Sequence, residues 1–374
     1  MGVKVLKNRG QQNPVASIVL LSDGRQSYQF FNSSSERWEP VHLQLTPLPR
    51  NMPRWDLGTD YLGQQKTFPV HSFGFGTDHE PVAMHVVADL SGGTFSFIES
   101  CEKLQDAFAS GIGGILSMVT QDLRLSVRPT LLGVEIKSIH SGGFATETSK
   151  SQGILNIGDL YADEEKEFLI NLSIPSLPND HRNQATEPKM PLLDITCTYT
   201  DVASKERVEI EGYLVDIHRP RSISPQDMVL SLEVDRQKNC LSVLRIIAQA
   251  QQMAETGNLT DAQAVLSKGR SNLLGTSSAQ AGDTLCMWLD AEMEETRKRM
   301  VNEALYLQRG RAYALSEMSS LTCQRASSRG NTVAGAEAFG SGFSFIGAGK
   351  SSVFGAYVTP NMAYMVSKSQ KLSK

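Results

Sequence analysis

The sequence has few cysteines, and no two of them lie close together. The chain of 374 residues contains five, at Cys101, Cys197, Cys240, Cys286 and Cys323. Because no C-x-x-C pair is present, the spacing indicates neither a structural zinc site nor a disulfide framework. Such sparse use of cysteine is typical of a reducing compartment, so we expect a cytoplasmic protein.

Long apolar runs and a strong net charge are also lacking. No run reaches the roughly 18 residues that a membrane span requires. The segment Met1–Leu6 has neither the core of a signal peptide nor the Ser/Thr of a myristoylation motif. The net charge is -4, and a basic run such as Arg297–Arg299 is too short for a nucleic-acid footprint. We therefore expect a soluble protein without a transmembrane segment that binds no nucleic acid.

Among the patterns that are present, the first is an apolar run over 15–21 that ends in Ser22, Asp23 and Gly24. It predicts a strand buried on both faces, with a carboxylate at the end where open α/β sheets place ligand sites. An irregular, proline-containing insertion is expected at about 25–66. Strands over 67–76 and 94–98 then alternate with helices over 81–90 and 104–123, which predicts a parallel βαβα unit.

After this unit the hydrophobic period changes from 3.6 to 2. Apolar residues alternate with polar ones over 168–174 and 193–199, and further strands are expected at 123–127, 132–139 and 207–217. An antiparallel β-sandwich over 124–220 fits this pattern. A helical domain is expected over 221–327, and the composition rich in Gly, Ser and Ala predicts a flexible tail over 328–374.

The order of these motifs resembles a known family. Four stretches carry the resemblance: Asn13–Gly24, His71–His79, Ser91–Ile98 and Gly158–Leu160. Together they are similar to the plant RING-type E3 ubiquitin ligases that carry a von Willebrand factor A domain. The resemblance implies a multidomain fold class: a partial α/β domain, then a β-sandwich, then a helical region.

The resemblance also implies what this sequence lacks. Family members have a RING finger before the von Willebrand domain, and no RING cysteines occur here. Residues 1–123 match only the C-terminal half of the von Willebrand domain, so we expect a truncated product or a fragmentary gene model. The exposed strand around Ile18 would then make 1–123 prone to aggregation, while 123–327 would fold alone.

One residue matches a metal ligand of the family. Asp23 corresponds to the aspartate of the von Willebrand metal site, whose other ligands lie upstream of this strand in family members. Since Mg²⁺ prefers about six oxygen ligands, Asp23 is the remnant of an incomplete site. We expect no cofactor in this chain, and a divalent cation only if the missing half is supplied. No catalytic residue is predicted.

Three other candidates have simpler structural interpretations. Asp89–Gly93 resembles the Asp-x-Ser-x-Ser loop but ends a helix. Gly347–Ser351 resembles the end of a phosphate-binding loop, but Ser344 stands where its first glycine belongs. His71, His79 and His85 cluster without nearby cysteines, which favours structural roles.

Two functions remain from the sequence alone. The first is a non-catalytic protein-interaction part, equivalent to the substrate-binding portion of a RING ligase, whose partners are ubiquitination substrates or family members. The second is a metal-dependent, ligand-binding von Willebrand factor A protein of the adhesion or chelatase type. The missing metal loop argues against the second.

Overall fold

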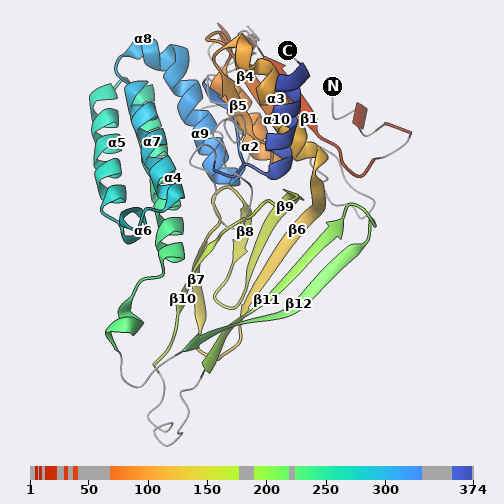
Figure 1. Cartoon of the computed structure of the whole chain (residues 1–374), viewed down its shortest axis with the longest axis vertical. Coiled ribbons are helices and arrows are strands. Elements are labelled where there is room, and N and C mark those ends of the chain that lie inside the picture. Colours follow the sequence, from red (N-terminus) through yellow and green to blue (C-terminus); the bar gives the residue numbers. More distant parts are fainter. Residues whose placement is uncertain are drawn as a thin grey trace, which may run out of the picture.

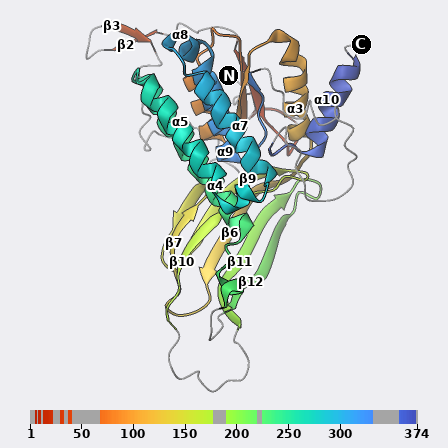
Figure 2. The same cartoon turned by 60° about the vertical axis from the view of Figure 1, so that its left-hand side comes forward.

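The structure is a computed structural model with three parts: a parallel sheet covered by helices, an antiparallel β region and a bundle of helices (Figure 1). The β region extends away from the other two parts, which lie side by side in both views (Figure 2). The structure describes residues 5–6, 8–10, 13–22, 29–32, 37–40, 68–176, 189–218, 224–330 and 356–372.

The parallel sheet has the order β1-β4-β5-β13. Its strands are β1 (Ile18–Ser22), β4 (Val70–Phe75), β5 (Phe95–Ile98) and β13 (Arg329–Gly330), and every neighbouring pair is parallel. Strands β4 and β5 are almost wholly buried, because helices cover both faces of the sheet. The α/β character that the sequence predicts is therefore present.

Each face of this sheet carries two helices. Helices α2 (Pro81–Ser91) and α9 (Arg311–Cys323) pack on Phe95 and Phe97. On the opposite face, α3 (Leu104–Leu116) and α10 (Pro360–Leu372) pack on Phe73 and Ile98. On each face, one of the two helices, α9 or α10, therefore comes from the C-terminal part of the chain.

The antiparallel region consists of two sheets around one core. The larger has the order β12-β11-β6-β9-β8 and the smaller the order β10-β7. The strands, in chain order, are β6 (Met118–Pro129), β7 (Glu135–His140), β8 (Ala145–Thr148), β9 (Gly153–Tyr161), β10 (Leu169–Ser173), β11 (Lys189–Asp201) and β12 (Arg207–His218).

The helical region follows β12 and has its own apolar core. Its helices are α4 (Leu232–Glu255), α5 (Leu259–Leu274), α6 (Ser277–Gln280), α7 (Thr284–Lys298) and α8 (Glu303–Leu305), and a π-helical turn over Tyr306–Gly310 leads into α9. Side chains cap the N-termini of the two longest helices and of α7: Ser231 for α4, Asn258 for α5 and Asp283 for α7. None of the helices in the described ranges combines the length and the apolar character needed to cross a bilayer.

The structure corrects three expectations about the N-terminal half. Strand β1 is not buried on both faces: it pairs with β4 at the edge of the described sheet, and Val19, Leu20 and Leu21 are 40%, 37% and 52% exposed, in agreement with the exposed strand expected around Ile18. The helix expected over 104–123 ends at Leu116, because Met118 enters β6 and pairs with β9. Within the expected insertion, β2 (Gln29–Asn32) and β3 (Arg37–Pro40) form an antiparallel pair, and its other residues lie outside the described ranges.

The flexible tail expected over 328–374 is also corrected. Arg329 and Gly330 form β13, and Pro360–Leu372 form α10, which packs along α3. Two glycines permit this close approach: a Cβ at Gly113 would lie 2.9 Å from the carbonyl oxygen of Asn361, and one at Gly114 would lie 2.6 Å from the Met362 Cε. Composition alone missed α10, because its apolar stripe is short and follows a run of small residues.

The separate folding expected of 123–327 does not fit this arrangement either. Helix α9 lies inside that range, yet it packs on β5 of the parallel sheet. A fragment without the sheet would expose the apolar face of α9 to water, which costs free energy.

We predict that Gly113→Leu displaces α10 from α3. The larger side chain overlaps the backbone of α10 and should lower the free energy of unfolding by about 1–3 kcal/mol. Amide hydrogen exchange should show loss of protection in α10 while α5 stays protected. Leu116→Ala, at a position on α3 that is 69% exposed, serves as the control. Unchanged protection of α10 in Gly113→Leu would contradict this packing.

Candidate functional site

Ligands of open α/β sheets bind beyond the carboxyl ends of the strands, so this edge is the first candidate. Asp23, the one residue that matches a family metal ligand, lies outside the described residues, as does Gly347–Ser351. Strand β1 is described only up to Ser22. The described part of the edge therefore consists of the segments that follow β4 and β5 and the end of β13.

The segment after β4 returns to the sheet and buries His79. The imidazole lies on Gly74, where a Cβ would come within 2.4 Å of the ring. Its ring centroid is 5.5 Å from that of Phe97 and 6.2 Å from that of Phe95. Burial lowers the pKa of His79. A neutral ring packed between aromatic side chains acts as part of the core.

The segment after β5 places one carboxylate at this edge. Glu99 is nearly buried and pairs with Arg309 at 2.5 Å and with Arg299 at 3.4 Å. Both arginines come from the helical region. Two cations thus occupy the acceptor oxygens that a metal would need, and the described residues hold no cluster of three metal-ligating side chains.

The Asp89–Gly93 stretch ends α2, as its sequence predicts. Gly92 adopts a left-handed conformation with φ of 76°, and its amide donates to the carbonyl oxygens of Ala88 and Asp89. A Cβ at Gly93 would lie 2.1 Å from the Val70 carbonyl oxygen, so only glycine fits beside β4. The stretch therefore joins helix to sheet.

A buried charged cluster, which we call the junction, joins all three parts of the molecule. Glu164, from the segment after β9, accepts hydrogen bonds from Arg325 at 2.7 and 2.9 Å and pairs with Lys166 at 2.8 Å. The three side chains are at most 6% exposed. Arg325 follows α9, and Lys166 also donates to the carbonyl oxygens of Cys323 and Gln324 at 2.7 and 2.9 Å.

The junction continues into the parallel sheet. The Arg325 guanidinium lies 4.0 Å from the centre of the Tyr161 ring, and the Tyr161 hydroxyl lies 3.3 Å from His71 Nε2. His71 Nδ1 accepts a hydrogen bond from the Thr94 amide at 3.3 Å. With Nδ1 as the acceptor, which also lies 3.0 Å from Thr94 Oγ1, the neutral ring carries its proton on Nε2, facing the Tyr161 hydroxyl.

These contacts set the protonation states in the junction. Burial alone would raise the pKa of Glu164, but Arg325 and Lys166 outweigh it and hold the pKa at about 2. Burial lowers the pKa of Lys166 to about 8 and that of His71 to about 3. At neutral pH the junction thus contains one carboxylate, a guanidinium, an ammonium group and a neutral imidazole. Every one of these groups has a partner, which suits a structural role.

A second buried cluster links β13 to the helical bundle. Arg329 pairs with Glu292 at 3.2 Å and lies 4.8 Å from the centre of the Trp288 ring. The Tyr313 hydroxyl donates to Glu292 at 2.9 Å. Nearby, fully buried Glu317 accepts from the Thr296 hydroxyl at 2.7 Å, and burial followed by repulsion from Glu292 raises its pKa to about 8.

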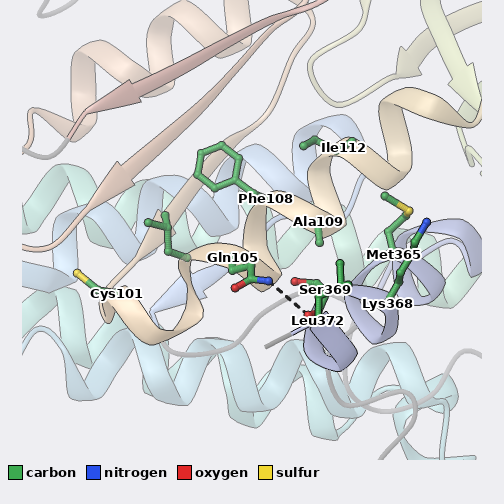
Figure 3. Close-up of a pocket in the computed structure, with 10 residues that line it drawn as sticks. Cys101, Gln105, Phe108, Ala109, Ile112, Met365, Lys368, Ser369 and Leu372 are labelled. Atoms are coloured by element: carbon green, nitrogen blue, oxygen red, sulfur yellow. Dashed lines mark hydrogen bonds between the residues drawn. The ribbon is translucent and has the colours of Figure 1, made fainter. Parts of the chain in front are cut away.

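A groove of about 680 Å³ lies between α3 and α10 (Figure 3). Its lining is mainly apolar: Leu104, Phe108 and Ile112 from α3 face Met365 and Leu372 from α10. Gln105 crosses it by donating to the carbonyl oxygen of Ser369 at 3.3 Å. Such a lining suits packing against another apolar surface better than it suits chemistry.

The charged clusters were missed by the sequence reasoning. Glu164 and Arg325 are 161 positions apart, and neither lies in a motif. Of the three histidines that cluster in the sequence, one, His71, belongs to the junction. His79 packs on Phe97, and His85 lies edge-on to Phe95 with the ring centres 6.4 Å apart.

We predict that His71 makes the protein less stable in mild acid. Between pH 6.5 and 3 the unfolded chain binds a proton at this histidine and the folded chain does not, so stability falls as the pH drops. At pH 5 the loss is about 2 kcal/mol relative to pH 7. His71→Gln keeps a hydrogen-bond donor and an acceptor but cannot titrate. Between pH 7 and pH 5 its free energy of unfolding should therefore fall by about 2 kcal/mol less than that of the wild type. Urea unfolding at pH 5, 6 and 7 measures it.

The control for this prediction is His218→Gln, on exposed strand β12. It should retain the pH dependence of the wild type. If His71→Gln and the wild type lose equal stability between pH 7 and pH 5, the buried neutral state assigned to His71 is wrong.

Comparison with known proteins adds to this geometry. The chain is 29% identical over 299 residues to the E3 ubiquitin-protein ligase WAV3 of Arabidopsis thaliana, which covers 79% of this chain and 34% of that protein. It is 26% identical over 297 residues to the probable E3 ubiquitin-protein ligase WAVH2 of the same plant, with coverage of 78% and 34%. The chain thus spans about a third of the length of these curated relatives.

A family model and solved structures also match. Residues 283–371 match the family model Vwaint, described as "VWA / Hh protein intein-like". A von Willebrand factor type A protein from Catenulispora acidiphila has a TM-score of 0.49 at 15% identity, covering 83% of this chain and 65% of that chain. The ArnB paralog VWA2 from Sulfolobus acidocaldarius has a TM-score of 0.36 at 17% identity, with coverage of 85% and 66%.

The family match from 283 to 371 runs from α7 to α10, so it includes most of the segment for which the sequence predicts a tail. The resemblance that the motifs indicate is confirmed: this chain is similar over about four-fifths of its length to plant E3 ubiquitin-protein ligases and contains a match to a von Willebrand factor A-associated family model.

Proposed function

We propose that this chain is the non-catalytic, partner-binding part of a ubiquitination machinery. The observation that carries the proposal is the similarity to WAV3 and WAVH2 over nearly four-fifths of the chain. Ubiquitin transfer by a RING needs two zinc ions held by eight Cys or His ligands. The chain has five cysteines, all five lie in the described ranges, and all are free thiols. Transfer would then depend on a RING supplied elsewhere.

The domain division belongs to the same proposal. The part built around β1, β4 and β5 would correspond to the C-terminal half of a von Willebrand factor A domain, 124–220 to its associated β-sandwich and 221–327 to the helical domain. The free thiols are in keeping with the reducing cytoplasm, where we place the protein. The partners would be other proteins, including ubiquitination substrates.

The alternative, a metal-dependent ligand-binding protein, has less support. It would use Asp23 as one oxygen ligand, and a divalent cation needs several more. Among the described residues at the same edge, the Glu99 carboxylate is already paired with Arg299 and Arg309. The geometry of the described edge therefore favours the protein-interaction role.

The test joins the chain to a heterologous RING domain. The fusion should attach ubiquitin to a defined set of cellular proteins, because the chain would bring them to the RING. Mass spectrometry of ubiquitin-remnant peptides measures this set, with the RING alone and a fusion carrying Arg325→Met as controls. Arg325→Met breaks the junction and should reduce the set.

The chain without a RING should discharge no ubiquitin from a loaded conjugating enzyme. A remnant profile of the fusion that matches that of the RING alone would overturn the partner-binding role. Autoubiquitination by the purified chain would overturn its non-catalytic character.

A further inference from the structure

Within the part of the chain that the structure describes, strand β12 forms a long, open edge of the larger antiparallel sheet. It runs over Arg207–His218, and in the described part of the chain β11 alone pairs with it. Figure 1 shows β12 at the outer side of the β region, away from the smaller β7-β10 sheet. Edge strands of native proteins are usually short, covered or charged, so an open edge of 12 residues calls for a reason.

The face of β12 that points toward the core is only half covered. Ile210 and Tyr213 are paired with Cys197 and Ile195 of β11, which pack against the core. Yet Ile210 is 52% exposed and Tyr213 is 69% exposed. Further along the strand, Val215 and Ile217 pack on the core. The smaller sheet, which packs on the same core, has two strands in the described region.

The opposite face of β12 carries carboxylates. The alternation of the strand, with a register shift at Gly212 (φ 81°), places Glu209, Glu211 and Asp216 on this face. The described residues supply no ion pair to these three side chains. Residues 207–218 contain these three carboxylates and one arginine, Arg207. Their net charge is therefore -2 when His218 is neutral.

We propose that β12 accepts an extended segment of a protein partner as an additional strand, and that this segment alternates apolar with basic side chains. Main-chain hydrogen bonds to the open edge would supply affinity, as in other cases of strand addition. The apolar side chains would cover Ile210 and Tyr213, and the basic ones would pair with Glu209 and Glu211. This inference rests on the proposed function and names the docking surface for it.

The charge of β12 argues against a second copy as the occupant. Two β12 strands paired edge to edge would bring a doubled negative charge to one seam, and like charges opposite each other destabilise a ladder. A basic segment removes this repulsion. The same carboxylates and the bulge at Gly212 protect the edge from self-association. The negative charge that opposes pairing with a second copy of the chain also favours a basic partner segment.

The experiment uses the full chain and three fluorescent decapeptides. The first alternates lysine with valine and isoleucine, the second has glutamate in place of lysine, and the third is the lysine peptide with its four central amides N-methylated. Anisotropy at low salt should show binding of the first peptide, at least about tenfold weaker binding of the second, and none of the third, because N-methyl groups block the ladder.

Variants locate the binding surface. The double substitution Glu209→Lys and Glu211→Lys should weaken binding of the lysine peptide roughly fivefold or more and improve binding of the glutamate peptide. Glu147→Lys, on the opposite edge strand β8, is the matched control and should change neither. Sedimentation of the free chain should show no dimer that depends on β12.

Several outcomes would overturn the inference: no binding of any peptide, equal binding of the lysine and glutamate peptides, binding of the N-methylated peptide, or no effect of the Glu209 and Glu211 substitutions. The RING fusion separates this failure from failure of the proposed function. If the fusion with both substitutions ubiquitinates the same proteins as the unaltered fusion, partner binding stands and β12 is not its surface.

Discussion

The contact between Glu164 and Arg325 is the interaction on which the arrangement of the three parts depends. Both side chains are almost fully buried, and removing a charge from water costs several kcal/mol unless partners replace the solvent. Here the replacement is complete: Glu164 binds Arg325 and Lys166, and Arg325 also lies on Tyr161. Each group is stable only where the others are in place, so the cluster fixes the segment after β9 against the end of α9.

From these contacts we expect the three parts to unfold together and not as independent domains. Helix α9 belongs to the helical region in sequence but covers the parallel sheet, and Arg329 leads from α9 into β13 while it pairs with Glu292 of α7. Arg299 and Arg309 reach from the helical region to Glu99. Strand β12 takes no part in these contacts, and within the described ranges β11 alone pairs with it.

Local patterns predicted the local structure well and the long-range contacts poorly. Strands β4 and β5 and helix α2 lie close to their expected positions, because their burial and capping are encoded in neighbouring residues. Residues 118–123 gave a helical pattern but form the start of β6, since pairing with β9 and β11 overrides this pattern. The arginine partners of Glu164 and Glu99 lie 161 to 210 positions away, and nothing in the sequence around these carboxylates indicates which arginines they contact. Asp23 lies outside the described residues, so its predicted role stays a prediction.

Native-state hydrogen exchange on Arg325→Met tests the role of the junction most directly. Removing the guanidinium leaves the Glu164 carboxylate buried with less compensation, which should lower the free energy of unfolding by about 3–5 kcal/mol. Since the junction couples the parts, the most protected amides of β4, β9 and α9 should lose protection together, while Arg207→Met on exposed β12 changes none of them. If β9 or β4 keeps its wild-type protection when α9 loses it, the parts fold independently and the junction does not hold them together.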